Sequence, residues 1–249
     1  MANRTPFIIL YILLSTFTLT LTVSGQSHDP YPHAVTDRLI HRETPMLPPP
    51  RNVVFTDPDF GASMVRATEA STNLELPGTF SRTEGSGEAN EWSADTRKFY
   101  VIEKGGQSLV FAFDPATMRI SSLPNARPGQ GLLLPLRAGA SFSFKNSDLI
   151  YGTSDADPLT IRSYDFSTGT SAAVIDTTTC GLEPPLVSGP SVVSDDDVTP
   201  SLDDNRVSIS EGGSQFGDHM FVVVYDKHLG CRWYNTQTGQ VGGNGEPLE

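Results

Sequence analysis

A short phrase decides the fold of this chain, because it returns three times. It reads FAFDPATM at residues 111–118, SYDFSTG at residues 163–169 and WYNTQTG at residues 233–239. Each copy follows a β-like stretch and places an aromatic residue before Asp or Asn and a few turn-forming residues. Asp and Asn close turns through their side chains, and Gly supplies a backbone with positive φ. We interpret the phrase as the hairpin between the last two strands of a repeated antiparallel sheet.

The line ahead of the first copy, EWSADTRKFYVI at residues 91–102, describes the opening of the same unit. One strand ends in Trp-Ser, a tight turn holds Asp95, and a second strand begins with aromatic residues. Stretches at residues 108–113 and 119–123 supply two further strands. Four antiparallel strands in sequence order are the unit of a β-propeller blade.

The unit recurs along the chain, with blades predicted at residues 90–124, 139–177 and 205–242. The marker residues Asp114 and Asp165 are 51 positions apart, which suits one blade of roughly 40–50 residues. Asp165 and Asn235 are 70 positions apart, so residues 178–204 are expected to form an insertion. The fold class that follows is all-β, a partial β-propeller of about three to four four-stranded antiparallel blades within a domain at residues 52–249.

The stretch WSADTRK at residues 92–98 resembles the W-S-P-D-G-K opening of the TolB-type propeller repeat. Phe113-Asp114 is similar to the Y-D-x-x-T-G closure of such TolB-like and WD40-like blades. Ala94 and Thr96 stand where that pattern has Pro and Gly. The resemblance covers residues 90–241 and implies the fold. Propellers of this type include periplasmic scaffolds, peptidase accessory domains and oligogalacturonate lyases, so the resemblance leaves the function open.

Three blades do not close a ring, since propellers have four to eight. A hairpin predicted at residues 52–68 can supply part of a fourth blade. Either the chain is a fragment that lacks C-terminal blades, or a partner covers its open edges. Uncovered sheet edges invite aggregation, which favours the fragment interpretation.

The first 25 residues are typical of a secretory signal peptide. Arg4 precedes an uncharged apolar stretch at residues 7–23, and small residues at 23–25 predict cleavage before Gln26. The alternative is an uncleaved membrane anchor, for which the stretch is at the short limit. Cleavage implies a secreted or extracytoplasmic protein without membrane contact.

Residues 26–51 are polar and rich in Pro, which predicts a disordered, flexible linker. His28, His33 and His41 lie there, but their irregular spacing favours a tether over a metal site. The net charge of −12 and the sequence pI of about 4.7 argue against nucleic-acid binding, because such a surface repels phosphates.

Cys180 and Cys231 are the two cysteines of the chain. Disulfides persist outside the cytosol, so we predict a bridge that ties the insertion to the neighbouring blade. Two free, buried thiols are the alternative.

Runs of carboxylates could bind calcium, which is the one possible cofactor that the sequence indicates. Asp195, Asp196 and Asp197 are calcium candidates, although adjacent like charges more often form a solvated loop. Asp57 and Asp59 have the same two interpretations, and there a capped turn is favoured. No other cofactor is predicted.

Motifs of hydrolases, zinc proteases and phosphate-binding loops are missing from the sequence. His219, beside Asp218 at the start of a strand, is the candidate catalytic base or ligand, although a His in that place is more often structural. The carboxylate pair of a glycosidase cannot be assigned, because many acidic residues are equally eligible.

The favoured function is a secreted propeller-like protein that binds or scaffolds a protein or polysaccharide ligand through the loops at one end of its blades. One alternative is a carbohydrate-active lyase or hydrolase that uses His219. The other is an incomplete piece of a longer propeller protein.

Overall fold

The computed structural model describes residues 39, 42–72, 81, 83, 89–181, 195–211 and 221–246. The predicted signal peptide, its cleavage point and most of the predicted linker, including His28, His33 and His41, lie outside these residues. Within them, no helix is long and apolar enough to cross a membrane.

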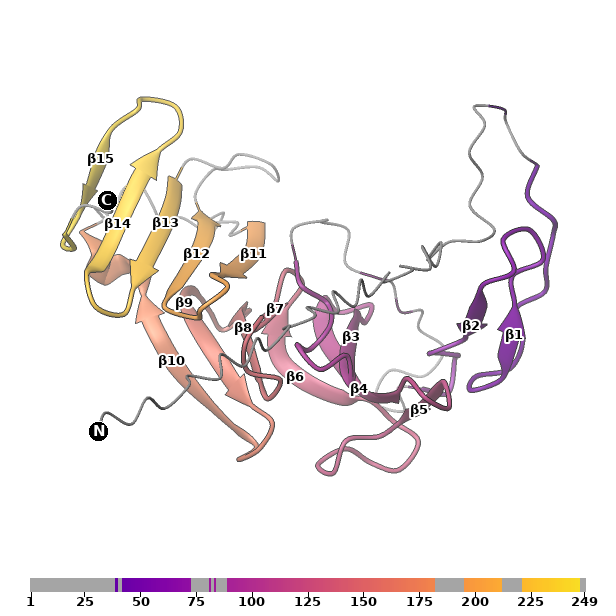
Figure 1. Ribbon diagram of the computed structural model, residues 1–249. Helices are drawn as coiled ribbons and strands as arrows, with labels where there is room; N and C mark the ends of the chain where they lie inside the picture. Colours follow the sequence, from indigo (N-terminus) through magenta and orange to yellow (C-terminus); the bar gives the residue numbers. More distant parts are fainter. Residues whose placement is uncertain are drawn as a thin grey trace, which may run out of the picture. The chain divides into compact units, whose positions relative to one another are not determined.

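The described residues form antiparallel strands and one short 3-10 helix, which confirms the all-β class (Figure 1). In chain order the elements are β1 (Val54–Thr56), β2 (Ser63–Val65), β3 (Lys98–Ile102), β4 (Gln107–Asp114), β5 (Arg119–Ser121), β6 (Leu132–Arg137), β7 (Ser141–Phe142), β8 (Leu149–Ser154), β9 (Asp157–Asp165), β10 (Thr170–Asp176), η1 (Thr177–Cys180), β11 (Asp195–Pro200), β12 (Arg206–Glu211), β13 (Phe221–Asp226), β14 (Gly230–Asn235) and β15 (Val241–Gly243).

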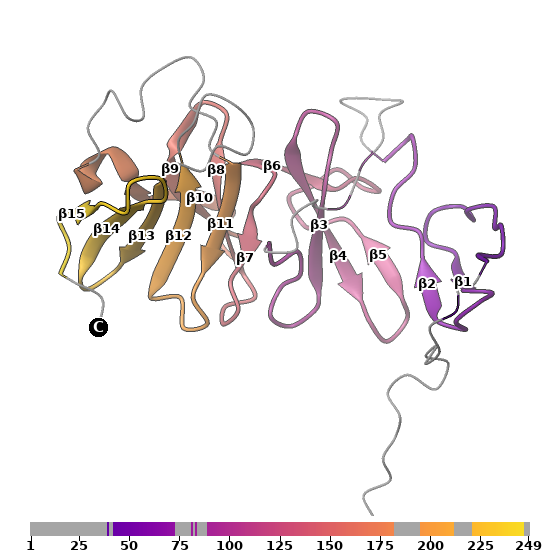
Figure 2. The ribbon, with the colours of Figure 1, turned by 90° about the horizontal axis from the view of Figure 1, so that it is seen from above.

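Three successive antiparallel sheets follow a small hairpin of β1 and β2. The first sheet consists of β3, β4 and β5, with β6 paired to β4 as well. The second sheet has the order β10-β9-β8-β7, and the third has the order β11-β12-β13-β14-β15. Figure 2 shows the five strands of the third sheet side by side in chain order. The second sheet is a four-stranded meander, the third adds a fifth strand, and in the first sheet β5 and β6 both pair with β4. Consecutive antiparallel sheets along the chain are the architecture that the repeats predict.

Strand alternation gives each of the first two sheets two buried faces. Ile150 of β8 packs with Tyr100 of β3 in a core between the first and second sheets, whereas the adjacent Tyr151 packs with Val207 of β12 in a core between the second and third. Successive side chains of a strand point to opposite faces, so one strand can serve both cores. The sheets therefore stack face to face.

The other face of the first sheet is covered by the segment around β1 and β2. The guanidinium of Arg51 lies 5.3 Å from the ring centre of Phe111. The side-chain amide of Asn52 donates to the carbonyl oxygen of Ile120 at 2.7 Å and accepts from its backbone N–H at 2.8 Å. Arg51, the last residue of the predicted linker, thus contacts β4, and the adjacent Asn52 is hydrogen-bonded to β5.

The opening turn of the first sheet is built by side-chain hydrogen bonds. Ser93 Oγ donates to Asp95 Oδ1 at 2.7 Å and accepts from the backbone N–H of Lys98 at 2.8 Å. Thr96 occupies the left-handed region with φ of 59°. Thr96 stands where the TolB-type pattern has Gly, the residue that adopts this conformation most readily.

The same turn opens the third sheet, between β11 and β12. Ser201 Oγ donates to Asp203 Oδ1 at 2.6 Å and accepts from the backbone N–H of Arg206 at 2.9 Å. Asp204 takes the place of Thr96, with the same φ of 59°. The first strand of this sheet is therefore β11, which lies inside the region predicted as the insertion 178–204.

The register of the third repeat consequently differs from the prediction. In the second sheet Asp165 closes the turn between the third and fourth strands, where it accepts from the backbone N–H of Ser167 at 2.8 Å. Its counterpart in the third sheet is Asp226, which accepts from the N–H of His228 at 2.8 Å. Asn235 closes a further turn and leads into a fifth strand, β15. The predicted blade at residues 205–242 therefore leaves out β11, the first strand of this sheet.

Candidate functional site

An open pocket of about 580 Å³ lies where turns of the second and third sheets meet. Residues 145–149 from the β7–β8 turn form one side, and residues 203–205 from the β11–β12 turn form another. Tyr151 of β8 and Lys227, which follows β13, complete the lining. This is the end of the sheets at which their first hairpins turn.

Asp204 is a lining residue of the pocket, and the β11–β12 turn sets its position. Only 7% of its surface is exposed. One carboxylate oxygen, Oδ2, accepts a hydrogen bond of 2.5 Å from Ser143 Oγ of the second sheet. The other, Oδ1, is buried and accepts none from the described residues. A buried acceptor left without a donor is costly, typically by about 1–3 kcal/mol.

Ser143 organises the facing turn as well as binding Asp204. Its Oγ accepts from the backbone N–H groups of Lys145 at 3.0 Å and Asn146 at 2.7 Å. The loop ends at Asp148, whose carboxylate forms an ion pair of 2.8 Å with Lys98 of the first sheet. The β7–β8 turn is therefore anchored on both neighbouring sheets.

Two titratable side chains of the pocket have pKa values that lie far from neutral. Burial raises the pKa of Tyr151 to about 12, and the negative charge of Asp204 adds to the rise. Hydrogen bonds from Ser201 and from the backbone of Asn205 lower the pKa of Asp203 to about 2. At neutral pH the tyrosine therefore stays protonated and the aspartate stays ionised.

The lysines add hydrogen-bond donors to this acidic surface. Lys145 and Lys227 are both exposed at the pocket. The backbone N–H of Lys227 donates to the carbonyl oxygen of Asn205 at 3.0 Å, which fixes the start of its side chain. Acceptors of Asp204 and donors of the two lysines thus surround one hollow. Such a mixture is suited to a ligand whose groups both donate and accept hydrogen bonds.

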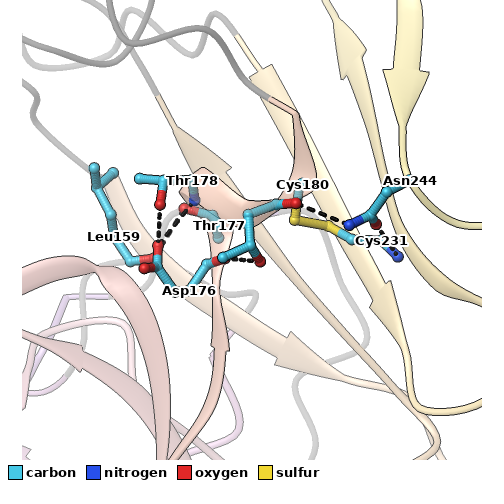
Figure 3. The surroundings of a disulfide bond; sticks show 8 residues. Leu159, Asp176, Thr177, Thr178, Cys180, Cys231 and Asn244 are labelled. Atoms are coloured by element: carbon cyan, nitrogen blue, oxygen red, sulfur yellow. Dashed lines mark hydrogen bonds between the residues drawn. A yellow bond between two sulfur atoms is a disulfide. The ribbon is translucent and has the colours of Figure 1, made fainter.

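The two cysteines lie at disulfide distance and join the second sheet to the third (Figure 3). Cys180, at the end of η1, and Cys231, in β14, have Cα atoms 5.3 Å apart, and both are fully buried. Asp176 caps η1 by accepting from the N–H of Thr178 at 3.0 Å. Asn244 donates to the carbonyl oxygen of Thr179 at 2.8 Å. The bridge indicates an environment outside the cytosol.

The other residues predicted as sites are His219 and the three aspartates at 195–197. His219 lies outside the described residues. Asp195, Asp196 and Asp197 begin strand β11, where a solvated loop was expected, and Asp195 pairs with Ser210 of β12. Among the described residues no three His, Cys, Asp or Glu side chains gather as metal ligands.

The second calcium candidate forms a capped turn, as the favoured interpretation predicts. Asp57 accepts from the backbone N–H groups of Asp59 and Phe60, both at 2.8 Å. Asp59 in turn accepts from the backbone N–H of Thr44 at 2.8 Å. The oxygens of this turn thus receive hydrogen bonds from the chain itself.

Ser143 and Tyr151 are residues of the candidate site that the sequence did not mark, and the sequence shows Asp204 only as part of the acidic run of the predicted insertion. The available signal was the Ser-x-Asp spacing of residues 201–203, which repeats that of residues 93–95. It locates the turn but gives no sign of the hydrogen bond to Ser143, which lies 61 positions away.

No family model matches the sequence, and no curated protein matches it either. Solved structures with similarity include an oligogalacturonate lyase from Vibrio parahaemolyticus, at 10% identity and a TM-score of 0.42 over 77% of this chain and 45% of that one. Another is an oligogalacturonate lyase in complex with manganese, at 14% identity and a TM-score of 0.32 over 64% of this chain and 50% of that one. The chain spans about half the length of each. The assignment to TolB-like or WD40-like repeats stays a prediction.

Proposed function

We propose that this chain is a secreted, propeller-like binding protein that holds a polar ligand in the pocket between the turns of its second and third sheets. The observation that supports this most is the open pocket of about 580 Å³, in which carboxylates of the β7–β8 and β11–β12 turns lie beside the exposed side chains of Lys145 and Lys227. Such a mixture of acceptors and donors is suited to a ligand with polar groups of both kinds.

The chemistry of the pocket supports binding over catalysis. A general acid or base working near neutral pH is most effective when its pKa lies near 7. The pKa of Asp203 is instead lowered to about 2, and the pKa of Tyr151 is raised to about 12. Both side chains are therefore fixed in one protonation state and act as permanent acceptor and donor.

The ligand is a polysaccharide or a segment of another protein that presents hydroxyl or amide groups. The pocket volume of about 580 Å³ falls within the roughly 300–1,000 Å³ typical of small-ligand sites. A carbohydrate-active enzyme that uses His219 is the alternative, and an incomplete piece of a longer propeller is the third interpretation. Calcium is not needed for the proposed binding.

Affinity electrophoresis through gels that contain xylan, β-glucan, mannan or polygalacturonate tests the proposal with the mature chain. We expect at least one polysaccharide to retard the protein, and Lys227→Glu to weaken the retardation about fivefold or more by removing a donor. Lys104→Glu, at the exposed β3–β4 turn, makes the same charge change away from the pocket and should leave retardation unchanged.

Equal loss in both lysine variants, or no retardation by any of the four polymers, would contradict a polysaccharide-binding pocket. Each polymer is also incubated with the protein and assayed for new reducing ends and for the ultraviolet absorbance of unsaturated products. Either signal, if His219→Gln abolishes it, would replace the binding function with the enzymatic one.

A further inference from the structure

We infer that β10, the edge strand of the second sheet, pairs antiparallel with β10 of a second copy of this chain, about a two-fold axis at Ala172. The strand ends the sheet order β10-β9-β8-β7 (Figure 1), and β9 is its one strand partner among the described residues. An edge strand presents a row of unpaired N–H and C=O groups to which a further strand can bond. This inference does not depend on the proposed function of the pocket.

The last strands of the other two sheets are protected against such pairing. In the first sheet β5 has only three residues, and the side-chain amide of Asn52 bonds both the N–H and the carbonyl oxygen of Ile120. In the third sheet β14 is covered by the three-residue strand β15 and by Gly245, whose N–H donates to the carbonyl oxygen of Cys231 at 2.8 Å. Short strands and covered edges are common defences against strand addition.

The first half of β10 has none of these defences. The strand is seven residues long, and its first four residues are exposed and pair with β9 in unbroken register. The register shifts only after Ala173, so the bulge that would bend the edge away lies in the second half. Residues 170–175 include no charged residue and no Pro. A regular, uncharged edge of this kind is suited to accept another strand.

A second copy of the chain fits this edge because the strand is complementary to itself. A two-fold axis at Ala172 places Ala172 opposite its own copy and Ser171 opposite Ala173, so no like charges meet where side chains come within about 4.5–5.5 Å. The net charge of −12 makes two copies repel one another as a whole. Arg162 of β9 lowers this repulsion at the edge, because its Nε donates to Ser171 Oγ at 3.3 Å and sets a positive charge beside β10. Two-fold dimers are also the commonest assemblies of soluble proteins.

Analytical ultracentrifugation of residues 26–249 over a range of protein concentrations tests the inference. We expect the wild type to show a monomer–dimer equilibrium. Ala172→Glu places two carboxylates directly opposite one another across the axis and should raise the Kd of the dimer about fivefold or more, and Ala172→Lys should do the same with two ammonium groups. An equimolar mixture of the two variants should dimerise at least as well as the wild type, because Glu then faces Lys.

Two controls accompany these variants. Ala94→Glu makes the same substitution at an exposed position in the opening turn of the first sheet, so it should leave the Kd of the dimer unchanged. Thermal unfolding of each variant verifies that it is folded at the temperature of the measurement. A synthetic peptide of residues 168–176 serves as a probe of the edge and should dissociate the wild-type dimer by pairing with β10 in place of the second copy.

Each other outcome overturns the inference in a distinct way. A wild type that stays monomeric at every concentration would rule out the second copy, and if that monomer binds the peptide, the edge accepts a strand of another protein instead. A dimer that both Ala172 variants leave unchanged would be formed by a different surface. A dimer that both variants weaken but their mixture does not restore would contradict the two-fold axis at Ala172.

Discussion

Glu211 illustrates at the residue scale how burial alone can make a side chain sensitive to pH. It ends β12 with 1% of its surface exposed, and its carboxylate oxygens accept no hydrogen bond from the described residues. Burial raises the pKa of Glu211 from its ordinary 4.5 to about 7, and the charge of Asp176 adds to the rise. The nearby hydroxyl of Thr177 opposes this rise in the pKa, although its hydrogen bond of 2.8 Å goes to the carbonyl oxygen of Leu159 and not to Glu211.

This shift predicts how stability depends on pH. A carboxyl group that binds its proton more tightly in the folded state stabilises the fold below pH 4.5, and that contribution is lost as pH rises to about 7. The free energy of unfolding should therefore fall by about 3 kcal/mol over this window. Aspartates with lowered pKa values, such as Asp165 and Asp203, titrate below it and act in the opposite direction.

Urea unfolding between pH 5 and 8 measures the effect. Glu211→Gln should flatten the decline and stabilise the protein at pH 8, whereas Glu246→Gln, at an exposed position, should unfold like wild type. A decline that persists unchanged in Glu211→Gln would show that another group is responsible.

Single residues also show which contacts can be predicted from the sequence and which cannot. Asp114, Asp165 and Asn235 close turns through their side chains, as predicted, because those hydrogen bonds span only two or three positions. Asp204 gains its role from Ser143 across a sheet interface, and no local pattern encodes that contact. His219 was predicted instead because histidine is the side chain that most often serves as a general acid or base.

At the scale of elements, β11 is the strand that the sequence did not predict. Its three consecutive Asp residues are typical of a solvated loop, yet it pairs with β12 and buries Val198 in the core between the second and third sheets. Tertiary packing overrides the low β-propensity of Asp here. The Ser-x-Asp turn that follows β11 marks the third sheet better than the phrase at residues 233–239. The turn shows where the first strand of the sheet ends, whereas the phrase lies between its last two strands.

The disulfide is an element-scale prediction with a direct test. Intact-mass measurement should show a gain of two hydrogen masses on reduction, and an alkylating agent should not modify the unreduced protein. The Cys180→Ala, Cys231→Ala double variant should lose roughly 2–5 kcal/mol of unfolding free energy, because the bridge spans 51 positions.

Wild-type protein treated with alkylating agent under denaturing conditions is the control for thiol access. Modification of both cysteines there, without prior reduction, would rule out the bridge. The loss of stability should come without a change in the far-ultraviolet circular dichroism, since Ala keeps the strand pairing of β14.

At the scale of the whole molecule, the repeats predicted from the sequence are realised as three consecutive antiparallel sheets with shared cores. The alternation of Ile150 and Tyr151 between two cores explains why β8 of the second sheet is apolar on both faces. The pocket follows from this stacking, because it brings the opening turns of neighbouring sheets to the same end. A sheet considered alone would not have revealed it.

The measurement that tests the candidate pocket most directly is chemical-shift mapping of the isotope-labelled protein, residues 26–249, during titration with soluble fragments of xylan, β-glucan, mannan and polygalacturonate. We expect the backbone signals that move to belong to residues 143–151, 203–205 and 227, at the turns of the second and third sheets. Signals that move only elsewhere, or none that move with any of the four polymers, would contradict a polysaccharide-binding pocket there.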